Sequence, residues 1–254
     1  VEFWKRLNPL LLRYLKNHAT IWAVSRFTKS SLTSRHSWDP EKIKVVNNCL
    51  DPHFDIPKEF TKPQELVERY QITNSAPVML TICRLNQHER RKGYTLVIEL
   101  MPELLKIRPD LHYIIGGEID TRERTLLHQL LTEMGLEHNV TISGFISDAE
   151  LTQHYLLADV FIMPSSKEGF GLVFTEAVVC GCNAIGGGKD GSADALMDGK
   201  LGDLLDPLAQ SSMIELILGR LNNPDKQRKY QLQELCILHF GFEVYKEKIK
   251  TLLK

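Results

Sequence analysis

The sequence predicts an α/β protein built on a doubly wound parallel sheet, with a partial second α/β unit at its amino-terminal end. From Pro77 onward, short apolar runs alternate with longer segments whose apolar residues recur at helical spacing. The loops between each apolar run and the next helix contain glycine. Repeated strand-helix alternation implies right-handed crossovers, which set the strands parallel to one another.

Composition limits the class of protein. The chain has 254 residues, of which 43% are hydrophobic and 25% charged, as expected for a globular protein with a sizeable core. A net charge of -1 gives no overall basic field, so nucleic acid is not an expected partner. The five cysteines are odd in number and lack metal-type spacing, which favours a reducing cytoplasm.

No stretch approaches the roughly 20 apolar residues that span a bilayer, and no signal peptide is recognisable. The predicted location is therefore the cytoplasm, with the inner face of the membrane as an alternative. Residues 3–17 carry apolar residues at helical spacing with basic residues between them, interrupted by Pro9. This helix is expected to pack against protein that precedes Val1, while peripheral association with a membrane surface is the alternative.

The remaining elements of the amino-terminal unit follow in order. A strand is expected at 20–24, a helix at 27–36 with Ser25 as its N-cap, and a strand at 43–46. Asn47, Asn48 and three prolines follow, so residues 47–75 are predicted to link two α/β units.

The main sheet and its helices come next. Strands are expected at 78–83, 111–115, 139–142, 159–163, 183–186 and, less regularly, 201–205. Helices are expected near 93–107, 121–135, 148–157, 171–180, 192–197, 208–220, 225–238 and 242–253. The sequence Ser147-Asp148-Ala149-Glu150 is typical of a capping box and predicts a helix start.

The most informative loop runs from Lys167 to Gly171, after the strand at 159–163. A glycine-bearing loop that enters a helix presents the free N–H groups and positive end of that helix to an anion. Glu168 precedes the helix and Glu176 lies two turns inside it, so they cannot both face one atom. They are placed to hold opposite ends of an elongated polyhydroxyl ligand.

Arg84 directly follows one strand and Lys92 directly precedes a helix, so both side chains are expected to face the crevice at the carboxyl ends of the strands. There they would meet a diphosphate. The alternative is that this loop, with Arg84, Arg90, Arg91 and Lys92, is a solvated basic patch, as an arbitrary basic run more often is. Position at a strand end and at a helix start distinguishes Arg84 and Lys92 from Arg90 and Arg91. Glu176 lies in an otherwise apolar helix, where a carboxylate needs hydrogen-bond donors; ribose hydroxyls would supply them.

Several other chemistries lack their motifs. The loop GGGKDGS at 186–192 does not have the spacing of a phosphate-binding P-loop, and no GxGxxG follows the first strand of the main sheet. The nine histidines show no metal-ligand spacing, and no GxSxG motif is present.

The segment EGFGLVFTEA at 168–177 resembles the motif of retaining glycosyltransferases of family 4. Collinear matches to that family occur at 24–32, 42–54, 82–94, 144–165 and 181–196. The resemblance implies the GT-B fold of two facing Rossmann-like domains. It implies that 1–46 is a remnant of the acceptor-side domain, 47–75 the linker, 76–240 the nucleotide-sugar-binding domain and 241–254 a helix crossing back.

The resemblance also implies roles for individual residues. Arg84 and Lys92 match the pair that holds the donor diphosphate, and Glu168 matches the acid that faces the transferred sugar. The remaining donor-binding positions are Glu176 on the ribose, the backbone of Phe170, Gly171 and Leu172, Phe145 and Ile146 near the base, and Gly117. Asn183, Asn48-Cys49 and Gly117-Glu118 depart from the usual residues of the family.

By the same resemblance the parent protein is a retaining hexosyltransferase. It would use a UDP- or GDP-sugar and a saccharide or glycolipid acceptor, with no metal and no cofactor. A nucleotide-sugar-binding module without chemistry is the alternative, because the acceptor side is expected to precede Val1. A GT-B epimerase or phosphorylase is a weaker alternative.

Overall fold

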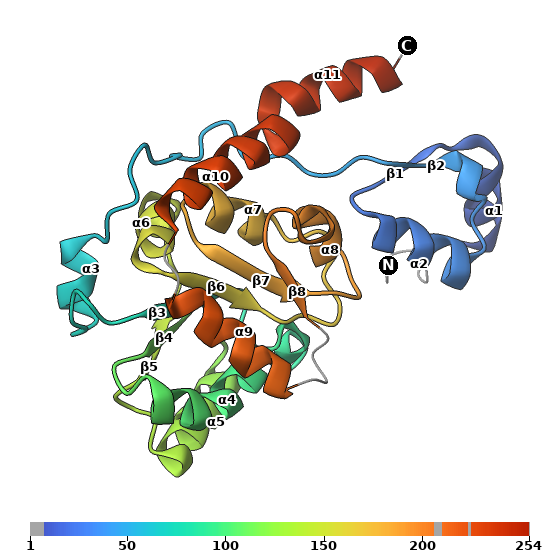
Figure 1. Cartoon of the computed structure of the whole chain (residues 1–254). Helices are drawn as coiled ribbons and strands as arrows, with labels where there is room; N and C mark the ends of the chain where they lie inside the picture. Colours follow the sequence, from blue (N-terminus) through green and yellow to red (C-terminus); the bar gives the residue numbers. More distant parts are fainter. Residues whose placement is uncertain (1–7, 206–209, 223–224, 254) are drawn as a thin grey trace.

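A six-stranded parallel sheet forms the centre of the protein (Figure 1). The computed structural model describes residues 8–205, 210–222 and 225–253. The strand order is β5-β4-β3-β6-β7-β8, with every pairing parallel. The strands are β3 (Val78–Ile82), β4 (His112–Gly116), β5 (Val140–Gly144), β6 (Val160–Met163), β7 (Asn183–Gly187) and β8 (Asp203–Leu205). The predicted fold class is confirmed.

The strand order reverses between β3 and β6. From β3 the chain builds outward through β4 to β5, then crosses back to β6 and builds outward through β7 to β8. The loops that leave β3 and β6 therefore run to opposite sides and leave a crevice at the carboxyl ends of these strands. The loop carrying Arg84 and Lys92 follows β3, and the loop carrying Glu168 follows β6.

Helices cover both faces of this sheet because successive strand residues point to opposite faces. On β3, Val78 and Leu80 join one apolar cluster, and Met79 joins the other. The first face is covered by α3 (Gln64–Arg69), α6 (Asp148–Leu157), α7 (Leu172–Val179) and α10 (Lys226–Phe240). The second is covered by α4 (Tyr94–Ile107), α5 (Thr121–Met134) and α9 (Gln210–Asn222). Short helices η3 (Arg90–Lys92), α8 (Ser192–Ala195) and η4 (Met197–Gly199) lie in the connecting loops.

The amino-terminal unit is a separate two-stranded parallel sheet. It contains α1 (Pro9–His18), β1 (Ile21–Ala23), α2 (Arg26–His36), η2 (Pro40–Lys42) and β2 (Ile43–Val45). Ser25 caps α2 as predicted, its side chain accepting a hydrogen bond from the N–H of Thr28 at 3.0 Å. Pro9 occupies the first turn of α1, where its missing N–H costs nothing. The predicted helical residues before Asn8 lie outside the described residues.

The structure corrects two predictions. Residues 64–69, inside the predicted linker, form α3, which packs on α6. The capping box is wrong, because the Ser147 hydroxyl contacts the carboxylate of Glu150 at 3.4 Å and makes no cap to the backbone. Arg69 of α3 binds that carboxylate at 2.6 Å. The helix nevertheless starts where expected, at Asp148.

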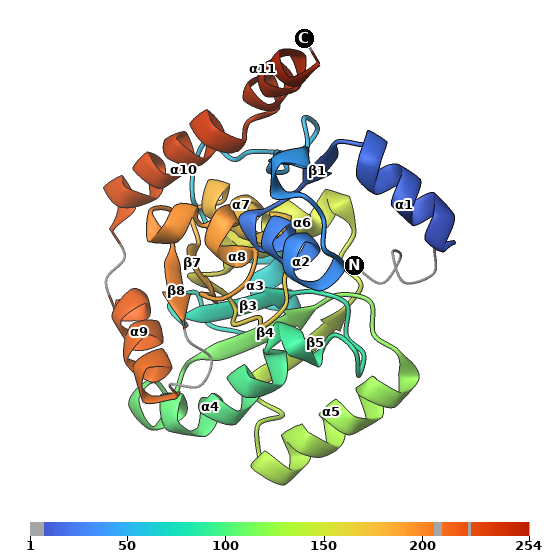
Figure 2. The same ribbon diagram turned by 90° about the vertical axis from the view of Figure 1, so that its right-hand side faces the viewer.

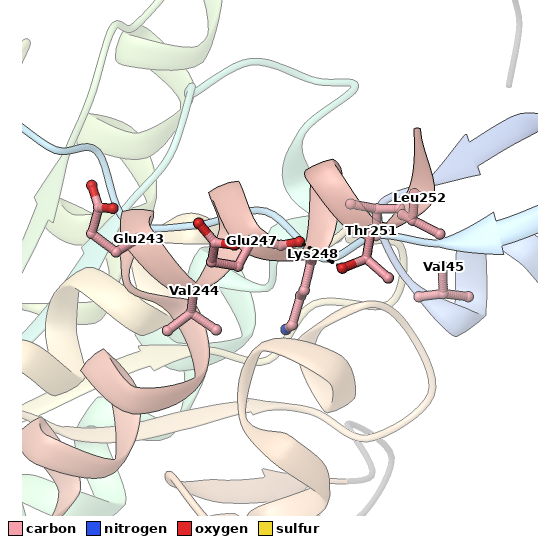
Figure 3. Close-up of a pocket in the computed structure, with 8 residues that line it drawn as sticks. Val45, Glu243, Val244, Glu247, Lys248, Thr251 and Leu252 are labelled. Atoms are coloured by element: carbon pink, nitrogen blue, oxygen red, sulfur yellow. Dashed lines mark hydrogen bonds between the residues drawn. The ribbon is translucent and has the colours of Figure 1, made fainter. Parts of the chain in front are cut away.

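The last helix, α11 (Phe242–Leu252), continues from the end of α10 (Figures 1 and 2). In Figure 1 it extends toward the side of the molecule that holds β2. Val45 of β2 and Val244, Lys248 and Leu252 of α11 line a cavity of about 750 Å³ (Figure 3).

On α1, Leu10, Leu11 and Tyr14 are exposed. In the described ranges, no helix is both long and apolar enough to cross a membrane.

Gly117→Ala should lower the melting temperature more than Gly135→Ala. Both glycines have positive φ, +135° and +64°, so alanine at either site is strained by about 1 to 3 kcal/mol. At Gly117 a Cβ would also lie 1.8 Å from the carbonyl oxygen of Cys83, whereas nothing lies within 4 Å of one at Gly135. Thermal denaturation measures both variants. Equal losses would contradict a required close approach between the ends of β3 and β4.

Candidate functional site

A cavity of about 390 Å³ lies at the reversal point of the sheet, bordered by the loops after β3 and β6 and by the start of α7. It brings together six of the predicted site residues, namely Arg84, Lys92, Glu168, Phe170, Gly171 and Leu172. The larger cavity between α11 and β2 contains none of the predicted residues. Chemistry and topology therefore both favour the smaller cavity as the candidate site.

Lys92 and Glu168 form an ion pair across this cavity, between the Lys92 Nζ and the Glu168 Oε2. Each side chain is only 15% exposed, so the pair is partly shielded from water. The second oxygen of Glu168, Oε1, accepts a hydrogen bond from the N–H of Gly169 at 2.7 Å. Both oxygens of this carboxylate thus have partners, and its orientation is fixed before any ligand arrives.

The cations of the loop after β3 divide into two groups. Arg90 makes hydrogen bonds of 2.8 and 2.9 Å to the buried carboxylate of Glu123, and Arg91 pairs with Glu89 at 3.0 Å. Arg84 is 75% exposed, and its nearest carboxylate oxygen, on Glu89, is 3.9 Å away. Arg90 and Arg91 therefore serve the loop itself, while Arg84 has the freedom to bind an anion.

The amino terminus of α7 supplies the complementary backbone groups. Gly171 precedes the helix with a φ of +87°, and no side chain caps the first turn. The first N–H groups of a helix have no acceptor within the helix, and the helix dipole adds positive potential there. Leu172 and Val173 of this turn line the cavity. This end of α7 is suited to an anionic oxygen.

Glu176 is half-buried and lies outside the cavity lining. The Tyr155 hydroxyl donates a hydrogen bond to its Oε2 at 2.8 Å, a donor that the sequence did not reveal. Burial raises the pKa of Glu176, the Tyr155 hydrogen bond partly offsets that rise, and the charges of Asp148 and Asp51 add to it. A carboxylate in this state gains from any further hydroxyl donor.

Phe145, Ile146 and Gly117 lie outside the cavity lining. Phe170 borders the cavity, but its ring is buried in the core against Phe240. Phe145 is 75% exposed after β5, whereas Ile146 is buried close to Gly116. The N–H of Gly117 donates to the carbonyl of Gly144 at 2.7 Å. Gly117 follows β4, and Phe145 and Ile146 follow β5; the carboxyl ends of these strands meet the same sheet edge as that of β3.

Sequence reasoning missed several residues of the site. Val24 after β1, Asn48 in the linker after β2 and Glu89 in the loop after β3 line the cavity. Asp190, in the GGGKDGS loop, accepts a hydrogen bond from the N–H of Glu168 at 2.6 Å. Its position just after an apolar strand was the available signal for Asp190. Val24 reaches the cavity lining only through the tertiary fold, which no local sequence pattern predicts.

The described residues contain no group of three or more His, Cys, Asp or Glu side chains arranged to hold a metal ion. All five cysteines are free thiols. Cys83 lines the cavity, and burial raises its pKa to about 12, so its thiol stays protonated at neutral pH. The charged side chains that line the cavity are Arg84, Lys92, Glu89 and Glu168.

The fold is a Rossmann-like α/β domain with a cavity at its reversal point. Residues 64–233 match the family model described as glycosyl transferases group 1, and the chain belongs to this family. The resemblance to family 4 glycosyltransferases is confirmed. A GDP-mannose-dependent phosphatidylinositol monomannoside mannosyltransferase of Mycolicibacterium smegmatis is 30% identical over 206 residues, which are 77% of this chain and 51% of that protein.

A D-inositol 3-phosphate glycosyltransferase of Paenarthrobacter aurescens is 29% identical, covering 95% of this chain and 60% of that protein. The crystal structure of HepE from Anabaena in complex with UDP superposes with a TM-score of 0.81 at 21% identity, over 98% of this chain and 68% of that one. At this identity the likeness concerns the fold. The chain spans about half to three-fifths of the length of these two curated relatives.

Glu176→Gln should raise the melting temperature at about pH 7.5, and the gain should shrink toward about pH 5. The pKa of Glu176 is raised in the folded state, so protonation stabilises the fold at low pH and that stabilisation is lost as the pH rises through the folded-state pKa. Glutamine mimics the protonated form and keeps an acceptor for Tyr155. Thermal denaturation across this pH range measures the difference.

Glu150→Gln provides a control of opposite sign. The hydrogen bond from Arg69 lowers the pKa of Glu150, so its contribution to stability is present above the ordinary pKa and disappears as the pH falls through the lowered one. This variant should lose stability at neutral pH and match the wild type in acid. The same pH trend in both variants would contradict the environment assigned to Glu176.

Proposed function

We propose that this chain is the donor-binding part of a retaining glycosyltransferase that moves a hexose from a nucleoside-diphosphate sugar to a saccharide or glycolipid acceptor. The observation that carries the proposal is the ion pair of Lys92 and Glu168 at the reversal point, beside the uncapped amino terminus of α7. A cation, a carboxylate and a set of free N–H groups in one cavity fit a ligand that joins a diphosphate to a sugar.

Each charged group of the site would contact a different part of the ligand. The diphosphate would lie between the start of α7 and the cations Arg84 and Lys92, which would stabilise the negative charge that develops on the departing nucleotide. Glu168 would accept hydrogen bonds from hydroxyls of the transferred hexose. Glu176, which already accepts a hydrogen bond from the Tyr155 hydroxyl, would accept further hydrogen bonds from the ribose hydroxyls. Phe145 and Ile146, together with Gly117, would border the base.

In this proposal the anomeric configuration is retained because the acceptor attacks from the face that the leaving phosphate vacates. The phosphate would take the proton of the acceptor hydroxyl, so the protein need not provide a base. Its contribution is positioning and electrostatic stabilisation. Arg84 and Lys92 would neutralise the diphosphate without a metal ion and without a cofactor.

Two donors are the first to test. The mycolicibacterial relative is described as GDP-mannose-dependent, and HepE has been crystallised with UDP. Base recognition through backbone atoms leaves little trace in side-chain identity. A thermal-shift panel of UDP, GDP and ADP with their sugars would identify the base, since at equal concentration a tighter ligand stabilises the folded state more.

A binding module without chemistry is the second candidate, favoured by the share of the relatives that the chain covers. Incubation of the chain with a radiolabelled donor and a saccharide acceptor separates the two. Binding of nucleoside diphosphate with no transfer and no donor hydrolysis would support the module. Turnover that persists in excess EDTA would support the metal-independent enzyme, and turnover abolished by EDTA would contradict it.

Arg84→Ala should weaken binding of the stabilising nucleoside diphosphate by about tenfold or more, because one charge-assisted bond to phosphate is lost. Arg91→Ala removes the same charge from the same loop, but that side chain is paired with Glu89, so its effect should stay within about twofold. Titration calorimetry measures both. Equal weakening would show a general field effect and contradict a specific diphosphate contact by Arg84.

A further inference from the structure

Glu168 is held by its backbone as well as by its side chain. Its N–H donates to Oδ2 of Asp190 at 2.6 Å, and its carbonyl accepts a hydrogen bond from the N–H of Gly191 at 2.9 Å. Two consecutive residues of the loop after β7 therefore bind both backbone polar groups of one residue in the loop after β6. These two hydrogen bonds fix the backbone of Glu168 and therefore the position of its Cα–Cβ bond.

Asp190 is itself immobilised. It is 3% exposed, and its Oδ2 also accepts a hydrogen bond from the hydroxyl of Ser165 at 2.7 Å. Its Oδ1 accepts one from the N–H of Ser192 at 3.0 Å. Asp190 thus ties the exit of β6, the Glu168 turn and the start of α8 into one buried network. A buried carboxylate with several donors is a rigid support.

Steric constraints at the end of β7 and in the loop that follows it agree with this arrangement. A Cβ on Gly191 would lie 2.1 Å from the carbonyl oxygen of Gly169 and 2.8 Å from that of Glu168. A Cβ on Gly187 would lie 1.9 Å from the carbonyl oxygen of Ser165. The two loops are in direct backbone contact, so a change in one shifts the other.

We propose that Asp190, with Gly191, is a positioning residue that sets Glu168 against the transferred sugar. This inference rests on the proposed function, because the position of Glu168 matters for binding only if a sugar lies beside it. Asp190 does not line the cavity and would not touch the ligand. Its effect should therefore be confined to the part of the donor that Glu168 recognises.

The experiment compares affinities for a nucleoside diphosphate and its sugar, using UDP with UDP-glucose and GDP with GDP-mannose. Asp190→Asn keeps the shape but presents an amide N–H₂ to a backbone N–H. It should lower the affinity for the sugar form by about tenfold and leave the affinity for the bare diphosphate within about twofold. Glu168→Gln should act the same way. The double variant should lose no more than Glu168→Gln alone, because Asp190 acts through Glu168.

Asp159→Asn is the matched control. Asp159 also accepts a backbone N–H, that of Val78 at 2.9 Å, and pairs with Lys62 at 2.6 Å, but it precedes β6 at the opposite end of the strand. This variant should be less thermostable yet keep the preference for the sugar form. If Asp190→Asn does not fold, Ser165→Ala removes one donor from the network and should reduce the preference by about threefold.

The outcomes separate the two claims. Losses in Asp190→Asn and Glu168→Gln that add in the double variant, or an unchanged preference in Asp190→Asn or in Ser165→Ala, would overturn the role of Asp190. Equal weakening of the bare diphosphate and of the sugar form would also overturn it, since that would be a general structural effect. A wild-type chain that binds none of UDP, GDP and ADP, nor their sugars, would instead overturn the proposed function.

Discussion

The reversal of strand order between β3 and β6 determines where the charged residues of this protein meet. The two loops that leave these strands diverge, and the space between them is bordered by the amino terminus of α7. Lys92 and Glu168 face each other across that space from different loops. Neither residue has this partner in the unfolded chain, so the ion pair is a product of the topology.

Electrostatics explain why most charged groups near the cavity have partners and Arg84 has only a distant one. Burying a charge without a partner is costly, and the structure supplies Glu123 to Arg90, Glu89 to Arg91 and Glu168 to Lys92. Arg84 can remain without a close partner because it is largely exposed. Glu176 is intermediate, since Tyr155 satisfies one of its oxygens while burial still raises its pKa. These are the conditions under which an anionic, hydroxyl-rich ligand would add contacts.

Much of the fold and the centre of the site were predictable because strand alternation and position at a strand end are local signals. They placed Lys92 and Glu168 correctly at one sheet edge. The short helix α3 was missed because six residues are too few to show a helical period. The Ser147 capping box was wrong because Arg69, distant in sequence, binds Glu150. Asp190 was overlooked because its role lies in contacts to a neighbouring loop, which sequence spacing does not show.

A crystal structure of the chain with the nucleoside diphosphate that stabilises it best would test the central claim most directly. The account predicts the diphosphate between Arg84, Lys92 and the first turn of α7, with the ribose hydroxyls at Glu176. Density for the nucleotide in the cavity between α11 and β2, or a bound diphosphate that contacts neither Arg84 nor Lys92, would contradict it.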